Sequence, residues 1–226
     1  MKKHPNQIIF PDPSNANPEG LLAYGGNLEP ETIIQAYTQG IFPWYDESSP
    51  IMWWSPDPRM VLFPKEMKIS NSLKHTLNSR KYKCSFDQSF KEVISQCARV
   101  SRAGQKGTWI TSEMQKAYLK LHKMGLAHSV ETWKNDQLIG GLYGISLGSA
   151  FFGESMFHHM PDASKVALYY LNEHIKKWNF DFIDAQTPTS HLKSMGAKEI
   201  SRDKFLNLLG KSMKKPNKTG SWTKNF

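Results

Sequence analysis

The sequence has few cysteines and no long apolar run. Its 226 residues include only Cys84 and Cys97, and no stretch approaches the roughly 20 consecutive apolar residues that cross a bilayer. The run Ile8-Ile9-Phe10 near the N-terminus is too short for the core of a signal peptide. We therefore expect a cytoplasmic protein with no membrane partner, whose two thiols stay reduced.

Motifs that hold metals or nucleotides are also absent. The chain contains neither a CxxC pair nor an HExxH helix, and no Walker-type phosphate loop. His158 and His159 are adjacent, and adjacent side chains point in different directions on a helix or a strand. The sequence therefore predicts no metal site and no bound cofactor.

The positive charge is concentrated at one end. Lys and Arg number 29 and Asp and Glu number 20, which gives +9. Residues 210–226 contain five lysines and no acid, so 9 − 5 = +4 remains for the rest of the chain. A tail of this kind typically solubilises a protein, although it also suits contact with RNA.

Proline divides the chain into two parts. Ten of the 13 prolines lie in the first 64 residues, where they disfavour long helices and central strands. One short helix, Pro30–Gly40, is expected there. We predict a small irregular N-terminal lobe over residues 1–64, with the boundary at Pro64-Lys65.

Residues 65–226 alternate between helical and strand periodicity, which gives an α+β fold class. Two helices (89–99 and one capped by Thr111) precede a three-strand meander at 128–133, 138–146 and 150–157. A long helix capped by Asp162 spans 163–178, and a strand follows at 180–184. This order resembles the mixed α/β domain of Gcn5-related N-acyltransferases, although a fold alone does not define a function.

Three groups of motifs carry a more specific resemblance. They are Gly20–Leu28 continuing through Gly40–Tyr45 to Trp53–Arg59, then Gly107–Thr111, and then Phe152–Phe157 with Phe182–Gln186. Over roughly residues 8–209 the chain resembles the leucyl/phenylalanyl-tRNA–protein transferases. The resemblance implies an aminoacyltransferase, active as a monomer, that moves Leu or Phe (Met is a further candidate) from aminoacyl-tRNA to the N-terminal Arg or Lys of acceptor proteins and marks them for N-degron degradation.

The resemblance assigns Trp44 and Trp109 to the terminal adenosine of the tRNA. Both lie in segments bounded by Gly or Pro, where a large ring is readily presented to a base. The alternative is that both rings fill the interface between the lobes.

Asp184 and Gln186 stand at the end of a predicted strand, where ligands gather in α/β domains. Residues two apart share a face if the strand persists. The resemblance makes this pair catalytic, with Gln186 positioning the attacking amine and Asp184 orienting Gln186. A network that caps the loop is the alternative.

Glu154 is a single acid among apolar neighbours and needs a partner if it is buried. The resemblance has it hold the aminoacyl end, and the alternative is a structural salt bridge with Lys165 or Arg59. Arg59 is also a candidate for an ion pair with Asp57.

The family pocket for the amino-acid side chain falls on Leu142, Phe151, Leu168, Leu171 and Ile183. By periodicity alone these are equally good core residues. Basic residues that suit the acceptor stem through its phosphates are Lys74, His75, Arg80, Lys81, Lys83, Arg99 and Arg102.

Two other functions fit the sequence less well. An acetyl-CoA enzyme needs a Gly-rich turn before the long helix, but His158–Lys165 contains no glycine, and Asp162 would repel a phosphate. A non-catalytic RNA-binding module does not explain Glu154 and Asp184, because two acids repel the RNA backbone.

Overall fold

The structure, a computed structural model, describes residues 8–100 and 108–225. Arg102 of the predicted basic set, Gly107 of the second motif and the N-terminal residues 1–7 lie outside these ranges. Within them, no helix is long and apolar enough to cross a membrane.

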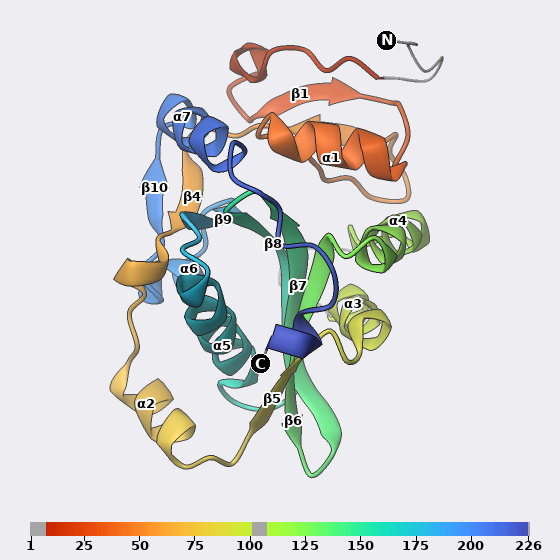
Figure 1. Ribbon diagram of the computed structural model, residues 1–226. Coiled ribbons are helices and arrows are strands. Elements are labelled where there is room, and N and C mark those ends of the chain that lie inside the picture. Colours follow the sequence, from red (N-terminus) through yellow and green to blue (C-terminus); the bar gives the residue numbers. More distant parts are fainter. Residues whose placement is uncertain (1–7, 101–107, 226) are drawn as a thin grey trace.

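The N-terminal lobe is a small sheet beside one helix (Figure 1). The strands β1 (Leu21–Tyr24), β3 (Met52–Trp54) and β2 (Phe42–Pro43) pair in that order, all antiparallel. The helix α1 (Pro30–Thr38) begins at a proline, and Gly40 follows it with a φ of 79°. Trp53 is buried at the centre and donates its indole N–H to the Gly25 carbonyl at 2.9 Å. The lobe predicted as irregular therefore has its own sheet, and its buried residues join the apolar core on one face of the large sheet.

The large sheet has seven strands in the order β10-β4-β9-β8-β7-β6-β5. These are β10 (Lys198–Ile200), β4 (Arg59–Leu62), β9 (Phe182–Gln186), β8 (Ala150–His158), β7 (Gln137–Leu147), β6 (Ala127–Lys134) and β5 (Lys83–Phe86). All neighbours are antiparallel except β8 and β9. The parallel pair is joined by α5 (Ala163–Lys177), since parallel strands need a long crossover.

β4 differs from the expectation that the first lobe extends to Pro64. It pairs with both β9 and β10, so the chain has already entered the large sheet at Arg59. Pro58 and Pro64 flank β4 without interrupting it, and all four of its residues are buried. Because the first 64 residues are rich in proline on average, the sequence did not predict this short strand between two prolines.

Helices cover both faces of the large sheet (Figure 1). α3 (Phe90–Arg99) and α4 (Ser112–Lys123) pack on one face, and α5 packs on the other with α2 (Asn71–Asn78) beside it. Each face has its own apolar core. Thr111 caps α4 by accepting the Met114 N–H, as predicted. Asp162 stands at the N-cap position of α5, as predicted, but with a φ of 64° its side chain makes no cap hydrogen bond and instead binds Lys165 and Thr76.

The chain ends with α6 (Ser190–Ser194), β10, α7 (Arg202–Ser212) and a short 3-10 turn, Trp222–Asn225. The last segment is not the free tail that its lysines suggested. Trp222 is only 1% exposed, stacks on His128 with ring centroids 3.8 Å apart, and donates its backbone N–H to Asp87. The tail therefore returns to the large sheet and closes one end of its core.

Candidate active site

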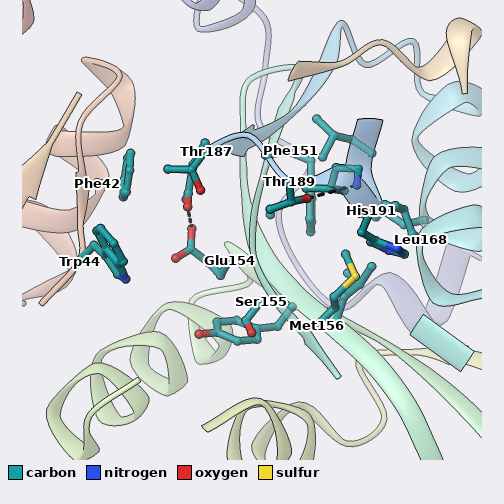
Figure 2. Close-up of a pocket in the computed structure, with 18 of the residues that line it drawn as sticks. Phe42, Trp44, Phe151, Glu154, Ser155, Met156, Leu168, Thr187, Thr189 and His191 are labelled. Atoms are coloured by element: carbon teal, nitrogen blue, oxygen red, sulfur yellow. Dashed lines mark hydrogen bonds between the residues drawn. The ribbon is translucent and has the colours of Figure 1, made fainter. Parts of the chain in front are cut away.

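A cavity of about 390 Å³ lies between the two lobes (Figure 2). It brings together Gln186 and all eight predicted substrate-binding residues: Trp44, Trp109, Leu142, Phe151, Glu154, Leu168, Leu171 and Ile183. Asp184 does not line the cavity and lies behind Gln186, with no exposed surface. A concave, mostly apolar cavity with a few convergent polar groups is typical of a site for a small ligand.

The apolar end of the cavity is built by β7, β8, β9 and α5. Phe151 and Ile183 are direct partners in the parallel pair, so their side chains lie on the same face. Leu168 and Leu171 are three residues apart on α5 and face that surface. These residues are at most 3% exposed, so they serve both as core and as pocket wall.

The two tryptophans come from opposite sides of the boundary between the lobes. Trp44 follows β2 and is 37% exposed. Its ring meets Trp54 edge to face at 5.5 Å, and Trp54 donates its indole N–H to the Trp44 carbonyl. Trp109 is partly buried just before α4. In Figure 2, Trp44 and Phe42 lie across the cavity from Leu168 and His191.

Arg59 is the partner of Asp184. Its Nε and Nη2 donate to the two carboxylate oxygens at 2.9 and 2.6 Å, and Nη1 donates to the Gly40 carbonyl at 3.1 Å. The guanidinium also lies 4.4 Å from the centre of the Phe205 ring. The expected pair between Asp57 and Arg59 is wrong: Asp57 instead accepts the backbone N–H of Arg202.

Gln186 takes an unusual backbone conformation. Its φ is 63°, in the left-handed region that few non-glycine residues occupy. Its backbone N–H donates to Asp184 Oδ1 at 2.9 Å, and its Nε2 donates to Glu154 Oε1 at 3.0 Å. Because the strand turns here, Asp184 faces Arg59 while Gln186 faces the cavity. Asp184 therefore links Arg59 to the backbone of Gln186.

Glu154 reaches the cavity from β8 and is 8% exposed. Its carboxyl lies within hydrogen-bond distance of the hydroxyls of Tyr37 at 2.7 Å and Tyr118 at 2.8 Å, and it accepts the Nε2–H of Gln186. Burial raises the pKa of this carboxyl to about 7, with a further upward contribution from the charge of Asp184 that the hydrogen bonds only partly offset. The alternative of a salt bridge to Lys165 or Arg59 is wrong, because Lys165 binds Asp162 and Arg59 binds Asp184.

Several residues of the site were not predicted. Tyr37 and Tyr118 lie on the apolar faces of their helices, where their spacing matches a core pattern. Their hydroxyls were the available signal, because a fully buried tyrosine usually has a hydrogen-bond partner. Other unpredicted residues that line the cavity are Phe42, Pro43, Tyr143, Gly153, Ser155, Met156, Ala185, Thr187, Thr189, His191 and Leu192.

The predicted basic residues are dispersed over the surface. Lys74, His75, Arg80, Lys81 and Lys83 are exposed on α2, on β5 and between them. Arg99 is exposed on α3, across the sheet from α2 (Figure 1). Among the described residues, no three His, Cys, Asp or Glu side chains lie together as metal ligands would.

Fold and cavity define a two-lobed α+β protein with a candidate active-site pocket, apolar at one end and lined by an amide and a carboxyl at the other. Family comparisons identify which enzyme this is. The leucyl/phenylalanyl-tRNA protein transferase family model matches residues 61–210, and the model of its N-terminal domain matches residues 26–57. The chain belongs to this family.

Relatives extend over nearly the whole chain. A leucyl/phenylalanyl-tRNA–protein transferase of Legionella pneumophila (strain Corby) is 56% identical over 96% of this chain and 97% of its own. One from Anaeromyxobacter dehalogenans (strain 2CP-C) is 51% identical over 96% and 94%. Among solved structures, a GCN5-related N-acetyltransferase from Kribbella flavida matches with 4% identity and a TM-score of 0.38, over 73% of this chain and 58% of that chain.

Proposed function

We propose that this chain transfers Leu or Phe, with Met as a further donor residue, from aminoacyl-tRNA to the free N-terminal Arg or Lys of acceptor proteins. The observation that carries the proposal is the cavity between the lobes, in which two tryptophans, an apolar end and the Gln186–Glu154 contact lie together. The product would be an N-degron, made in the cytoplasm by a monomer.

The donor fits the cavity in three parts. The terminal adenine would stack on Trp44 and Trp109. The leucyl or phenylalanyl side chain would pack against the apolar wall formed by Leu142, Phe151 and Ile183. The ester carbonyl would then lie near Gln186. Exposed lysines and arginines would contact the acceptor stem through phosphates, which gives a salt-dependent attraction without sequence preference.

In the chemical step, the α-amine of the acceptor attacks the ester carbonyl carbon. A C–N bond forms, the C–O bond to the ribose breaks, the amine loses a proton and the ribose oxygen gains one. The ester is already activated, so no cofactor is needed. The amide of Gln186 is no base, and its Nε2 is directed to Glu154, which leaves its oxygen to accept the amine N–H. Much of the rate would come from holding amine and ester together.

The test is transfer of radiolabelled Leu from Leu-tRNA to a peptide that begins with Arg, beside the same peptide with an acetylated N-terminus. We expect label only on the free peptide, and its loss in Gln186→Ala. A chain that turned over acetyl-CoA and transferred no Leu would contradict the proposal.

A further inference from the structure

Three side chains form a closed hydrogen-bonded triangle at the edge of the cavity. The hydroxyls of Tyr37 and Tyr118 lie 2.7 Å apart, and each also lies 2.7 or 2.8 Å from one oxygen of the Glu154 carboxyl. Both tyrosines have no exposed surface, and neither lines the cavity. Only Glu154 of the three reaches the ligand space.

The number of hydrogens decides the charge of this triangle. Each of the three contacts is short enough to require a hydrogen between its oxygens. Two tyrosine hydroxyls supply only two hydrogens. If Glu154 were ionised, one contact would set two lone pairs against each other at 2.7 or 2.8 Å. A proton on Glu154 supplies the third hydrogen and lets the bonds run around the ring in one direction.

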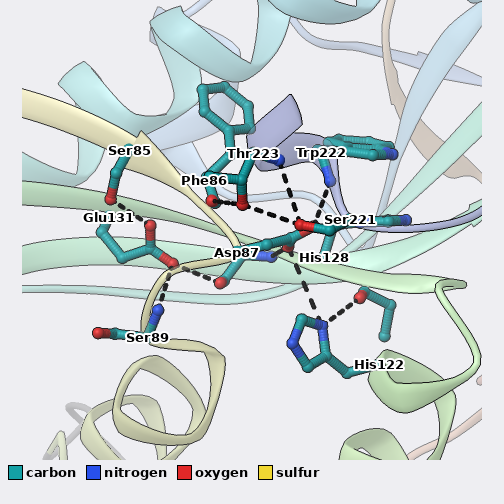
Figure 3. Close-up of polar contacts among 12 residues, drawn as sticks. Ser85, Phe86, Asp87, Ser89, His122, His128, Glu131, Ser221, Trp222 and Thr223 are labelled. Carbon is teal, nitrogen blue, oxygen red and sulfur yellow. Dashed lines mark hydrogen bonds and ion pairs between the residues drawn. The ribbon is translucent and has the colours of Figure 1, made fainter. Parts of the chain in front are cut away.

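A second buried glutamate shows the contrast. Glu131 accepts hydrogen bonds from the hydroxyls of Ser85 and Ser129 and from the backbone N–H of Ser89 (Figure 3). Each of these three contacts has its own hydrogen. The Glu131 site is therefore complete around a carboxylate, whereas the Glu154 site is complete only around a carboxylic acid.

The charges around Glu154 agree with this count. The titratable groups that face it are Tyr37 of α1, Tyr118 of α4 and Asp184 of β9, and Tyr143 of β7 lies against the tyrosines. Burial raises the pKa of both Tyr37 and Tyr118, so neither gives up its proton at neutral pH. Among the described residues no Lys, Arg or His pairs with Glu154, and Arg59 is engaged by Asp184.

We propose that Glu154 works as a neutral carboxylic acid, and that its proton, together with the Arg59–Asp184 pair, keeps the cavity free of net negative charge. The consequence, which rests on the proposed function, concerns the acceptor amine. An anion in this buried place would hold the α-amine as an ammonium ion, which has no lone pair for attack. A neutral Glu154 leaves the amine as the free base. Tyr37 and Tyr118 are positioning residues that act through Glu154.

Infrared spectroscopy of the free full-length protein tests the proton directly. With ¹³C-labelled glutamate, we expect a protonated-carboxyl band at pH 6 that disappears as the pH is raised to 9 and is absent from Glu154→Gln. Should that variant not fold, Tyr37→Phe provides the assignment, because loss of one hydrogen bond shifts the band. A spectrum with no protonated glutamate at pH 6 would overturn the proposal, and this result does not depend on whether the chain transfers Leu.

The pH dependence of transfer separates a neutral acid from an anion. Glutamine imitates a protonated carboxyl, since its N–H donates and its C=O accepts, so Glu154→Gln keeps the ring closed. Transfer by the wild-type protein should decline above pH 7, where Glu154 loses its proton. We expect Glu154→Gln to retain transfer within about tenfold of the wild-type rate at pH 6 and to show no such decline. Glu154→Ala should lose about 100-fold in transfer rate.

Glu131→Gln, a matched change at a buried glutamate outside the cavity, should keep the original pH profile. Loss of transfer by folded Glu154→Gln at every pH would mean that the anion is needed, and the proposal would be wrong. If the original chain transfers no Leu, the proposed function fails, while the infrared titration still decides the state of Glu154.

Discussion

Arg59 and Asp184 form a bidentate ion pair, although neither side chain has any exposed surface. The pair joins β4 to β9, and the same carboxylate accepts the backbone N–H of Gln186. Arg59 also donates to the Gly40 carbonyl, which lies in the N-terminal lobe. A contact hidden from the substrate thus fixes Gln186 and connects the two lobes.

Replacement of Arg59 should lower the free energy of unfolding strongly. Arg59→Met leaves the Asp184 carboxylate buried and unpaired, which costs about 3–5 kcal/mol in the free energy of unfolding. Urea denaturation measures this loss. Lys120→Ala breaks the exposed pair with Glu29, and there we expect less than about 1 kcal/mol. Equal losses in the two variants would contradict the role given to Arg59.

The tryptophans at the mouth of the cavity should control donor affinity. Trp44→Ala or Trp109→Ala removes a stacking surface worth about 1–3 kcal/mol per base, so we expect KM for Leu-tRNA to rise about 5- to 150-fold. Steady-state transfer assays measure KM. Trp133→Phe, which alters an indole bound to Ser85 outside the cavity, should leave KM unchanged. Unchanged KM in Trp44→Ala would show that its ring only fills the interface.

The apolar wall should set the choice of side chain. Phe151→Leu enlarges the cavity, so kcat/KM should shift from Leu-tRNA toward Phe-tRNA by about tenfold or more. The measurement is competition between the two donors in one reaction. Phe157→Leu is the same change on the same strand, but Phe157 packs in the other core, and we expect the ratio to stay constant. A similar shift in both variants would point to a general loss of order.

Stability should depend on pH through Glu154. Its pKa is raised from an ordinary 4.5 to about 7 in the folded state, so folding takes up a proton between these values. The resulting stabilisation is complete below pH 4.5 and is lost as the pH rises through about 7. Relative to Glu154→Gln, the original chain should therefore lose up to about 3 kcal/mol between pH 5 and pH 8. Denaturation curves at four pH values measure this, and a constant difference would contradict it.

The C-terminal turn should stabilise the large domain. Trp222 fills a space among Phe86, Phe151, His128 and His174, and Trp222→Ala should cost about 3–5 kcal/mol. Thermal and urea denaturation measure the loss. Lys218→Ala, an exposed change in the same segment, should stay within about 0.5 kcal/mol. Equal stability of Trp222→Ala and the original chain would show that the turn only rests on the surface.

The sequence predicted the regular elements well where their periodicity was strong. The three strands β6, β7 and β8 and the helix α5 lie within one or two residues of their expected ranges. The turns at Asn135-Asp136 and Gly148 mark the ends of the strands, and α5 repeats its apolar residues with helical spacing, so local information is sufficient.

Contacts between residues that are far apart in the sequence could not be predicted from local sequence patterns. Arg59 lies two residues from Asp57, which made the near pair the natural expectation, yet its partner is 125 residues away. The tyrosines of the Glu154 triangle match an apolar stripe, and periodicity cannot distinguish a packed ring from a hydrogen-bonding hydroxyl. Trp222 stands alone in a polar segment, where nothing nearby indicates burial. The family resemblance supplied the pocket residues, which periodicity alone had left equally suited to the core.

The position of β4 has a consequence for synthesis on the ribosome. β4 is made early, but both strands that flank it, β9 and β10, are made more than 100 residues later. Until then both edges of β4 lack a neighbouring strand, and the Arg59 guanidinium lacks the Asp184 carboxylate as its ion-pair partner. Strand edges that wait in this way are prone to wrong pairings. A nascent chain that stops before β9 has most of the helices but no Gln186, so the enzyme becomes active only when synthesis is nearly finished.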